Sequence, residues 1–107
     1  MNTLTQQLSK LLPPLYSTEN FLPDQVRVPV KLFNAYGVGT WYITEFDGKD
    51  IMFGFCNLGD DEMAELGYVS LKELQSLKVY GIIPAIEKDR FWDPQTTLHE
   101  VVTFKAR

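Results

Sequence analysis

The sequence has few of the residues that carry covalent or redox chemistry. It contains one cysteine, Cys56, and one histidine, His99. A single cysteine excludes an intramolecular disulfide and a metal site built from several thiolates. A Ser-His-Asp triad would depend on His99, which we expect to face solvent on a helix. We therefore predict no catalytic residue, and we interpret Cys56 as a small hydrophobic side chain within a strand.

Long apolar runs and phosphate-binding motifs are also missing. No apolar stretch approaches the roughly 18 residues of a membrane span, and residues 1–12 lack the basic start and apolar core of a signal peptide. We therefore expect a cytoplasmic protein without a membrane partner. Neither GxGxxG nor a P-loop is present in the sequence, so we predict no cofactor.

Positive charge is scarce relative to negative charge. The chain has 10 Lys and Arg residues against 14 Asp and Glu residues, which gives a formal net charge of −4. Because binding to phosphate backbones depends on clustered Lys and Arg, this balance argues against a general nucleic-acid-binding protein. The 107 residues, 45% of them hydrophobic, suit one domain, 1–107, with a single core.

A central stretch of the chain predicts the folding unit. Alternating apolar residues predict strands at 40–46, 51–58 and 66–70. Asp47-Gly48 predicts a tight turn between the first two of these strands. Ser70 and Glu73 have the spacing of a capping box, which predicts a helix near 70–79.

The sequence of these strands also predicts which side chains share a face and where a strand is irregular. Strict alternation in the strand 40–46 predicts that three residues share one face: Trp41, Ile43 and Glu45. The other three are expected on the opposite face: Tyr42, Thr44 and Phe46. Gly54, in the next strand, predicts a bulge or a close neighbour because it has no side chain to pack.

Segments on either side of this unit add two helices and two strands. They are a helix at 3–12, a strand at 26–34, a strand at 82–86, and a helix from the capping box Thr97/Glu100 to about Ala106. Four leucines are expected on one face of the first helix: Leu4, Leu8, Leu11 and Leu12. Pro29 cannot donate to a ladder, so we expect an edge strand that could pair with a second copy near Val28.

Helices at the ends and strands in the middle predict the fold class. The order indicates an α+β fold with an antiparallel β-meander of about four to five strands. An N-terminal helix, the helix near 70–79 and a C-terminal helix flank the meander.

Carboxylates are the most numerous candidates for chemistry. The acidic loop residues Asp60, Asp61, Glu62 and Glu65 have the oxygen ligands that divalent cations prefer, but they lack the spacing of a calcium loop, so we predict no metal site. Three further carboxylates could act as acid and base if the fold joined them: Glu45, Glu87 and Asp89. Ion pairs with Lys31 or Arg90 are the alternative interpretation.

Aromatic residues are the second group of candidates. Trp41, Tyr42, Phe91 and Trp92 could stack nucleic-acid bases, but acidic rather than basic residues are interspersed with them. We therefore interpret most of them as core residues. Trp92 is the exception, because it lies among charged residues in a loop, and we expect it at an interface.

Five motifs in order carry a family resemblance. They are PVKLF (29–33), TWYITEFD (40–47), FGFCNLG (53–59), ELGYVSLKEL (65–74) and IPAIEKD (83–89). With them the chain resembles, from about Thr3 onward, the family catalogued as domain of unknown function 2958. Members are small bacterial and phage proteins, frequent on plasmids and integrative elements, and sometimes encoded near or joined to antirestriction-type and DNA-processing proteins.

The resemblance marks eight positions of this chain: Lys31, Trp41, Glu45, Glu65, Gly67, Tyr68, Glu87 and Asp89. Lys88 departs from the family pattern, in which an arginine is expected. Lysine offers a point charge in place of a bidentate guanidinium. The resemblance implies a fold and a genomic context, and it implies no mechanism.

These observations favour a non-catalytic accessory protein of a phage or mobile genetic element that binds a protein of host defence or DNA processing. One alternative is a nucleic-acid-binding domain that presents Arg27, Lys31, Trp41 and Arg90 on one face. Another is a small carboxylate- or metal-dependent enzyme that uses Glu45, Glu65, Glu87 or Asp89. The candidate interaction residues are Lys31, Trp41, Glu45, Asp60, Asp61, Glu62, Glu65, Tyr68, Glu87, Asp89 and Trp92. The sequence leaves the partner and the oligomeric state open.

Overall fold

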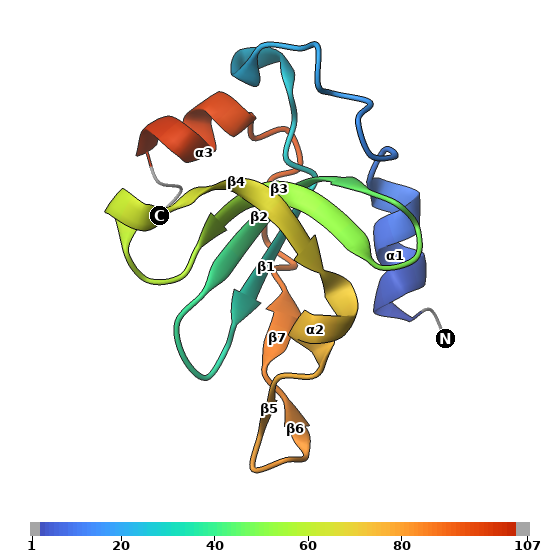
Figure 1. Ribbon diagram of the computed structural model, residues 1–107, viewed down its shortest axis with the longest axis vertical. Helices are drawn as coiled ribbons and strands as arrows, with labels where there is room; N and C mark the ends of the chain where they lie inside the picture. The colour runs from blue at the N-terminus through green and yellow to red at the C-terminus, as the bar shows by residue number, and fades with distance from the viewer. Residues whose placement is uncertain (1–2, 105–107) are drawn as a thin grey trace.

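A five-stranded antiparallel sheet organises the fold, in the order β4-β3-β2-β1-β7 (Figure 1). The computed structural model describes residues 3–104. The strands of this sheet are β1 (Val30–Asn34), β2 (Thr40–Phe46), β3 (Ile51–Asn57), β4 (Glu65–Ser70) and β7 (Ile86–Lys88). The first four follow one another as a meander, and β7 returns to pair with β1. The predicted α+β meander is confirmed.

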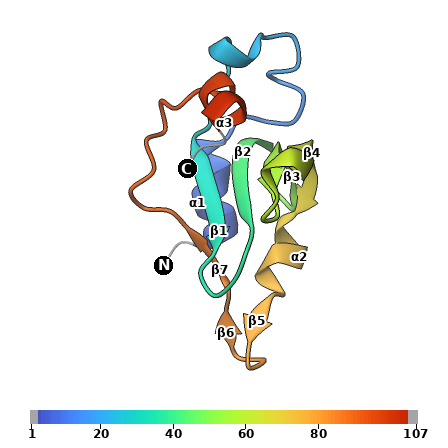
Figure 2. The same cartoon turned by 90° about the vertical axis from the view of Figure 1, so that its left-hand side faces the viewer.

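The other secondary-structure elements of the described residues are three α-helices, two 3₁₀ turns and a two-stranded ribbon. The α-helices are α1 (Leu4–Leu11), α2 (Leu71–Gln75) and α3 (Leu98–Phe104), and the 3₁₀ turns are η1 (Pro23–Gln25) and η2 (Asp61–Met63). Strands β5 (Lys78–Val79) and β6 (Ile83–Pro84) form a two-stranded ribbon that extends beyond the sheet (Figures 1 and 2). Between residues 3 and 104, no helix has both the length and the apolar character needed to cross a bilayer.

One face of the sheet packs against α1 and α2. Thr3 and Gln6 form a capping box that starts α1. Leucines of the two helices pack on the sheet and form a core with its strands: Leu8, Leu12, Leu71, Leu74, Val30, Leu32, Trp41, Ile43, Phe46, Met52 and Ile86. Leu11 is 45% exposed, so the prediction that it shares the inward face of α1 with the other leucines is wrong.

The opposite face packs against α3 and the segment before β1. A second core joins them to the sheet: Val26, Val28, Tyr42, Phe55, Leu98 and Val101. The predicted capping box of Thr97 and Glu100 is confirmed, because each backbone N–H donates to the other side chain at 3.1 Å. The predicted end of this helix at Ala106 lies outside the described residues.

An extra residue in β2 interrupts the ladder with β3. Ile43 pairs with Gly54, but the next pair joins Glu45 to Phe53, so Thr44 is left over as a bulge. A Cβ atom at Gly54 would lie 2.1 Å from the carbonyl oxygen of Tyr42. The close neighbour predicted at Gly54 is therefore confirmed, and the bulge forms in the strand opposite.

The bulge changes which side chains share a face. Phe46 joins the core of Trp41 and Ile43, against α1 and α2. Glu45 turns to the other face, where it lines a pocket with Phe53. The prediction that Glu45 lies beside Trp41 and Ile43 is therefore wrong, because one extra residue reverses the alternation beyond it.

Backbone pairing overturns three further predictions. The first strand is not an edge: β1 lies between β2 and β7, and Val28 before it is buried with its N–H bonded to the carbonyl of Thr96 at 2.8 Å. The helix near 70–79 ends at Gln75, because residues 78–79 pair with β6. The strand 82–86 is divided between β6 and β7, and Ala85 between them bonds to Leu77 and Ala35.

Candidate functional site

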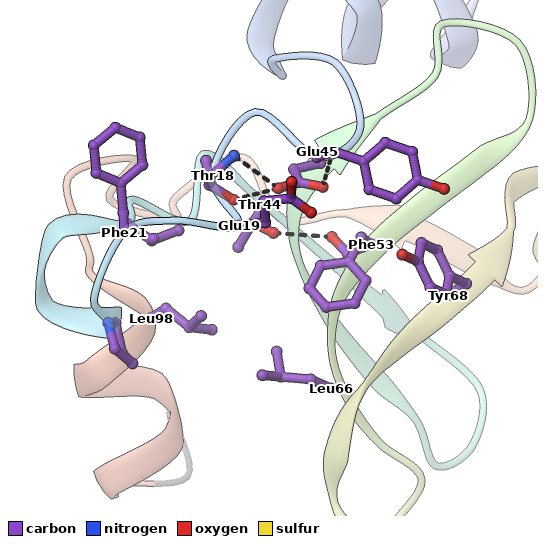
Figure 3. Close-up of a pocket in the computed structure, with 12 residues that line it drawn as sticks. Thr18, Glu19, Phe21, Thr44, Glu45, Phe53, Leu66, Tyr68 and Leu98 are labelled. Atoms are coloured by element: carbon purple, nitrogen blue, oxygen red, sulfur yellow. Dashed lines mark hydrogen bonds between the residues drawn. The ribbon is translucent and has the colours of Figure 1, made fainter.

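A pocket of about 270 Å³ lies over β2, β3 and β4 (Figure 3). The segment 16–26 forms one wall and the sheet forms the floor. Four aromatic residues line it: Tyr16, Phe21, Phe53 and Tyr68. The other lining residues are Thr18, Glu19, Pro23, Val26, Thr44, Glu45, Leu66 and Leu98. The charged side chains among them, Glu19 and Glu45, are both acidic.

Glu45 is the buried carboxylate of this pocket. Glu45 is 3% exposed, and its Oε1 accepts a hydrogen bond from the backbone N–H of Tyr16 at 2.8 Å. Its Oε2 accepts from the backbone N–H of Thr18 at 3.1 Å and from the Thr18 hydroxyl. Burying a carboxylate is costly unless hydrogen bonds replace its hydration. Glu45 therefore ties the wall of the pocket to its floor.

The backbone of Tyr16 has an unusual conformation at its hydrogen bond to Glu45. Its φ is 70°, a left-handed conformation that bulky residues rarely adopt. Such a conformation costs about 1–3 kcal/mol and persists where the surrounding structure holds it. The hydrogen bond to Glu45 holds Tyr16 in place, and its ring reaches Tyr68 with 6.5 Å between centroids.

Exposed rings form the rim. The Tyr68 ring also contacts Phe53, with centroids 5.0 Å apart, yet Tyr68 remains 57% exposed. Partial desolvation raises the pKa of the Tyr68 phenol, and hydrogen bonding to Tyr16 and the charge of Glu45 raise it further. The phenol is therefore neutral near pH 7, and the rim combines apolar ring faces with a hydroxyl group.

Lys31, Asp89 and Trp92 form a separate cluster. The Nζ of Lys31 lies 3.7 Å from Oδ2 of Asp89 and 5.4 Å from the centroid of the Trp92 ring. The indole N–H of Trp92 donates to the carbonyl of Val28 at 2.8 Å, and its ring packs on Tyr42. Trp92 is thus half-buried and supports the loop after β7. The alternative interpretation of Asp89, an ion pair with Lys31, is confirmed.

The acidic loop forms its own local structure. Asp60 caps η2 by accepting from the N–H of Glu62 at 3.0 Å, and Asp61 accepts from the side chain of Asn57 at 2.8 Å. Asp61 also lines a wider hollow of about 500 Å³ beside Lys31 and Tyr42. Within residues 3–104, the side chains of His, Cys, Asp and Glu form no group of three that could hold a metal ion.

The four carboxylates proposed for an enzyme site, Glu45, Glu65, Glu87 and Asp89, do not converge at one place. Glu65 lies on β4 and Glu87 on β7, at opposite edges of the sheet. Four strand spacings separate these edges, roughly 19 Å. Glu45 is held by the wall of the pocket, and Asp89 by Lys31. The hypothesis of a shared carboxylate site is therefore not supported by the geometry.

The nucleic-acid-binding face is not formed either. Trp41 is 6% exposed and packs against α1 and α2. Lys31 pairs with Tyr42 in the ladder and so lies on the other face of the sheet. The ring of Trp41 and the cation of Lys31 therefore cannot contact one strand of nucleic acid together.

The remaining candidates have structural surroundings. Cys56 is partly buried against the helix-covered core, and burial followed by the charge of Glu65 raises the pKa of its thiol. A raised pKa disfavours the nucleophilic thiolate. His99 is exposed on α3 near the hydroxyl of Thr103, as expected for a residue that faces solvent.

Two of the candidate interaction residues line the pocket, and the residues of its wall are not among the candidates. Glu45 and Tyr68 were candidates, but Tyr16, Thr18 and Phe21 lie in an irregular segment without periodicity. Gly54 is the available signal, because it predicts a bulge or a close neighbour, and the close approach of β2 at Gly54 accompanies the bulge that turns Glu45 away from the helix-covered face.

Fold and site together define a small α+β protein with an aromatic pocket built around one buried carboxylate. The chain belongs to the family described as "Protein of unknown function (DUF2958)", whose model matches residues 4–106. This confirms the resemblance drawn from the five motifs. No curated protein and no solved structure matched the chain.

Proposed function

We propose that this protein is an interaction domain that binds another protein through the pocket over β2, β3 and β4. The observation that carries the proposal is the exposed rim of a preformed hollow, where Tyr16, Phe21, Leu66 and Tyr68 each keep about half of their surface in water. Contiguous apolar patches on a protein surface mark binding sites, and aromatic anchors supply much of the energy of interfaces.

The family resemblance supports the class of partner. It implies a phage, plasmid or other mobile genetic element as the source and a protein of host defence or DNA processing as the target, in the cytoplasm. The net charge of −4 suits a target with a basic surface, because opposite charge speeds association. Antirestriction is one activity that binding to a protein of host defence would produce.

A pair of tyrosine variants tests the proposal. Tyr68 and Tyr36 are both 57% exposed, but only Tyr68 lines the pocket. The wild-type protein should capture a stoichiometric partner from host lysate, and Tyr68→Ala should reduce the recovery by about tenfold or more, as expected for loss of a central aromatic anchor. Tyr36→Ala should capture as much partner as the wild type.

Circular dichroism and thermal melting would show that both variants are folded. Equal capture by Tyr68→Ala and the wild type would contradict the proposal, as would the absence of any captured partner.

A further inference from the structure

The chemistry of the pocket selects a cation. The acidic side chains of its lining are Glu19 and Glu45, and its lining contains no Lys, Arg or His. Among residues 3–104, no basic side chain forms an ion pair with either of them. An anionic ligand would be repelled here. A purely apolar ligand would remove water from the carboxylates without replacing it.

Glu45 retains room for another donor. An ionised carboxylate offers about four acceptor positions. Tyr16 and Thr18 fill three of them, with one bond to Oε1 and two to Oε2. The remaining position is on Oε1, which accepts only the backbone N–H of Tyr16. Because the existing bonds fix the carboxylate, a cation that enters the pocket meets an acceptor that is already oriented.

The rings favour a guanidinium over an ammonium. The ring of Tyr68 contacts those of Tyr16 and Phe53, and the three rings line the pocket together with the two carboxylates. A guanidinium is planar, stacks on aromatic faces and is less strongly hydrated than the ammonium of lysine. Apolar walls from Leu66 and Leu98 suit the methylene stem of an arginine side chain.

We infer that the pocket binds an arginine side chain of the partner protein, with its guanidinium between the aromatic rings and the carboxylates of Glu19 and Glu45. The inference rests on the proposed function, because the arginine is assigned to a protein that docks on this pocket. It adds the chemical group by which that protein is recognised.

Two small probes that differ in charge test the inference. N-acetylarginine methylamide and its neutral isostere N-acetylcitrulline methylamide would each be titrated at millimolar concentrations into the ¹⁵N-labelled 107-residue protein. The arginine probe should cause saturable shifts of the amide signals of Tyr16, Thr18 and Tyr68, and it should bind at least about fivefold more tightly than the citrulline probe.

Two glutamate variants give a matched control. Glu19 and Glu87 are both exposed, but Glu87 lies on β7, away from the pocket. Glu19→Gln should weaken arginine binding by about twofold or more, and Glu87→Gln should leave it unchanged. Phe21→Ala removes an exposed ring of the lining and should weaken binding without unfolding the protein. Equal binding of both probes, or no shift at the pocket, overturns the inference.

The outcomes separate the two proposals. Loss of partner capture in Tyr68→Ala, together with no preference for the arginine probe, would leave the interaction site standing and remove the arginine. A preference for the arginine probe, together with full partner capture by Tyr68→Ala, would show a guanidinium site that is not the protein-binding surface.

Discussion

Two tyrosines of the described chain have a left-handed backbone, and they differ in what holds them there. Tyr16 has a φ of 70° and forms part of the pocket wall, where its N–H donates to the buried carboxylate of Glu45. Tyr80 has a φ of 56° and lies at the tip of the β5–β6 ribbon, where it is 89% exposed. The two residues carry the same kind of backbone strain in opposite surroundings.

The two tyrosines differ in how far along the sequence the residues that hold their backbones lie. Tyr80 is followed by Gly81 with a φ of 70°, and the N–H of Ile82 donates to the carbonyl of Val79 at 3.2 Å. Two consecutive positive φ values belong to a type I′ turn, so the hairpin itself requires the conformation at Tyr80. Tyr16 also lies in a local turn, in which the N–H of Ser17 donates to the carbonyl of Pro14 at 3.3 Å, but its own N–H is held by a side chain 29 positions away in the sequence. The pocket is therefore a product of long-range contacts.

Gly54→Ala should have the largest effect on stability, because it disturbs the bulge that orients Glu45 toward Tyr16. The added Cβ would lie 2.1 Å from the backbone of Tyr42, which cannot give way without separating β2 from β3. We expect a loss of about 3 kcal/mol in the free energy of unfolding, measured by urea denaturation. Hydrogen exchange should show the amides of Tyr16 and Thr18 losing protection, with the ribbon unchanged.

Gly67→Ala is the matched control. Gly67 pairs directly with Gly54 across β3 and β4, but a Cβ atom there would meet nothing within 4 Å. Its free energy of unfolding should stay within about 0.5 kcal/mol of the wild type. Similar losses in the two variants would show that the close approach at Gly54 does not control the bulge.

Replacing each strained tyrosine by glycine should change stability in opposite directions. In Tyr80→Gly, relief of about 1–2 kcal/mol of left-handed strain exceeds the roughly 0.5–1 kcal/mol that glycine adds in chain entropy. The free energy of unfolding should rise by about 0.5 kcal/mol. In Tyr16→Gly the same relief is outweighed by loss of the ring contact with Tyr68, and stability should fall by about 1 kcal/mol.

Tyr36→Gly serves as the control for this pair, because the φ of Tyr36 is not positive. Only the entropy of glycine acts there, and stability should fall by about 0.5–1 kcal/mol. Urea denaturation of the three variants under one set of conditions provides the measurement. A change of the same sign at Tyr16 and Tyr80 would remove the distinction between the two sites.

Local patterns in the sequence are sufficient to predict most of the helices, strands and turns. The capping box of Thr97 and Glu100, the alternation in β3 and the Asp47-Gly48 turn depend on residues only a few positions apart, and the structure has all three. The position of β1 between β2 and β7 depends on pairing with residues more than 50 positions later, which alternation cannot show.

The pocket was less predictable for the same reason. Glu45 was identified as a carboxylate and by its place in a family motif, but the bulge decided which face it occupies. Tyr16 and Phe21 come from a segment whose only pattern is turn residues, so their place in the lining of the pocket has no sequence signal. Tyr68 itself was identified through the resemblance, and its ring contacts became visible only with the fold.

The smallest effect concerns the ionisation of Tyr68. Desolvation raises the pKa of its phenol, and hydrogen bonding to Tyr16 contributes further, so Tyr16→Gly should lower this pKa part of the way to the ordinary value of about 10. Tyr80→Gly should leave it unchanged, because the ribbon does not contact the pocket. Titration of the ¹³Cζ signal of Tyr68 would measure both values.

The same shift predicts how stability depends on pH. Folded Tyr68 holds its proton more tightly than the unfolded chain does, so its contribution is complete below the ordinary pKa and is lost as the pH rises through the raised one. Wild-type stability should therefore fall above about pH 10 more steeply than that of Tyr16→Gly. Parallel curves would mean that Tyr16 does not influence Tyr68, and that the left-handed backbone of Tyr16 serves the wall of the pocket but not its rim.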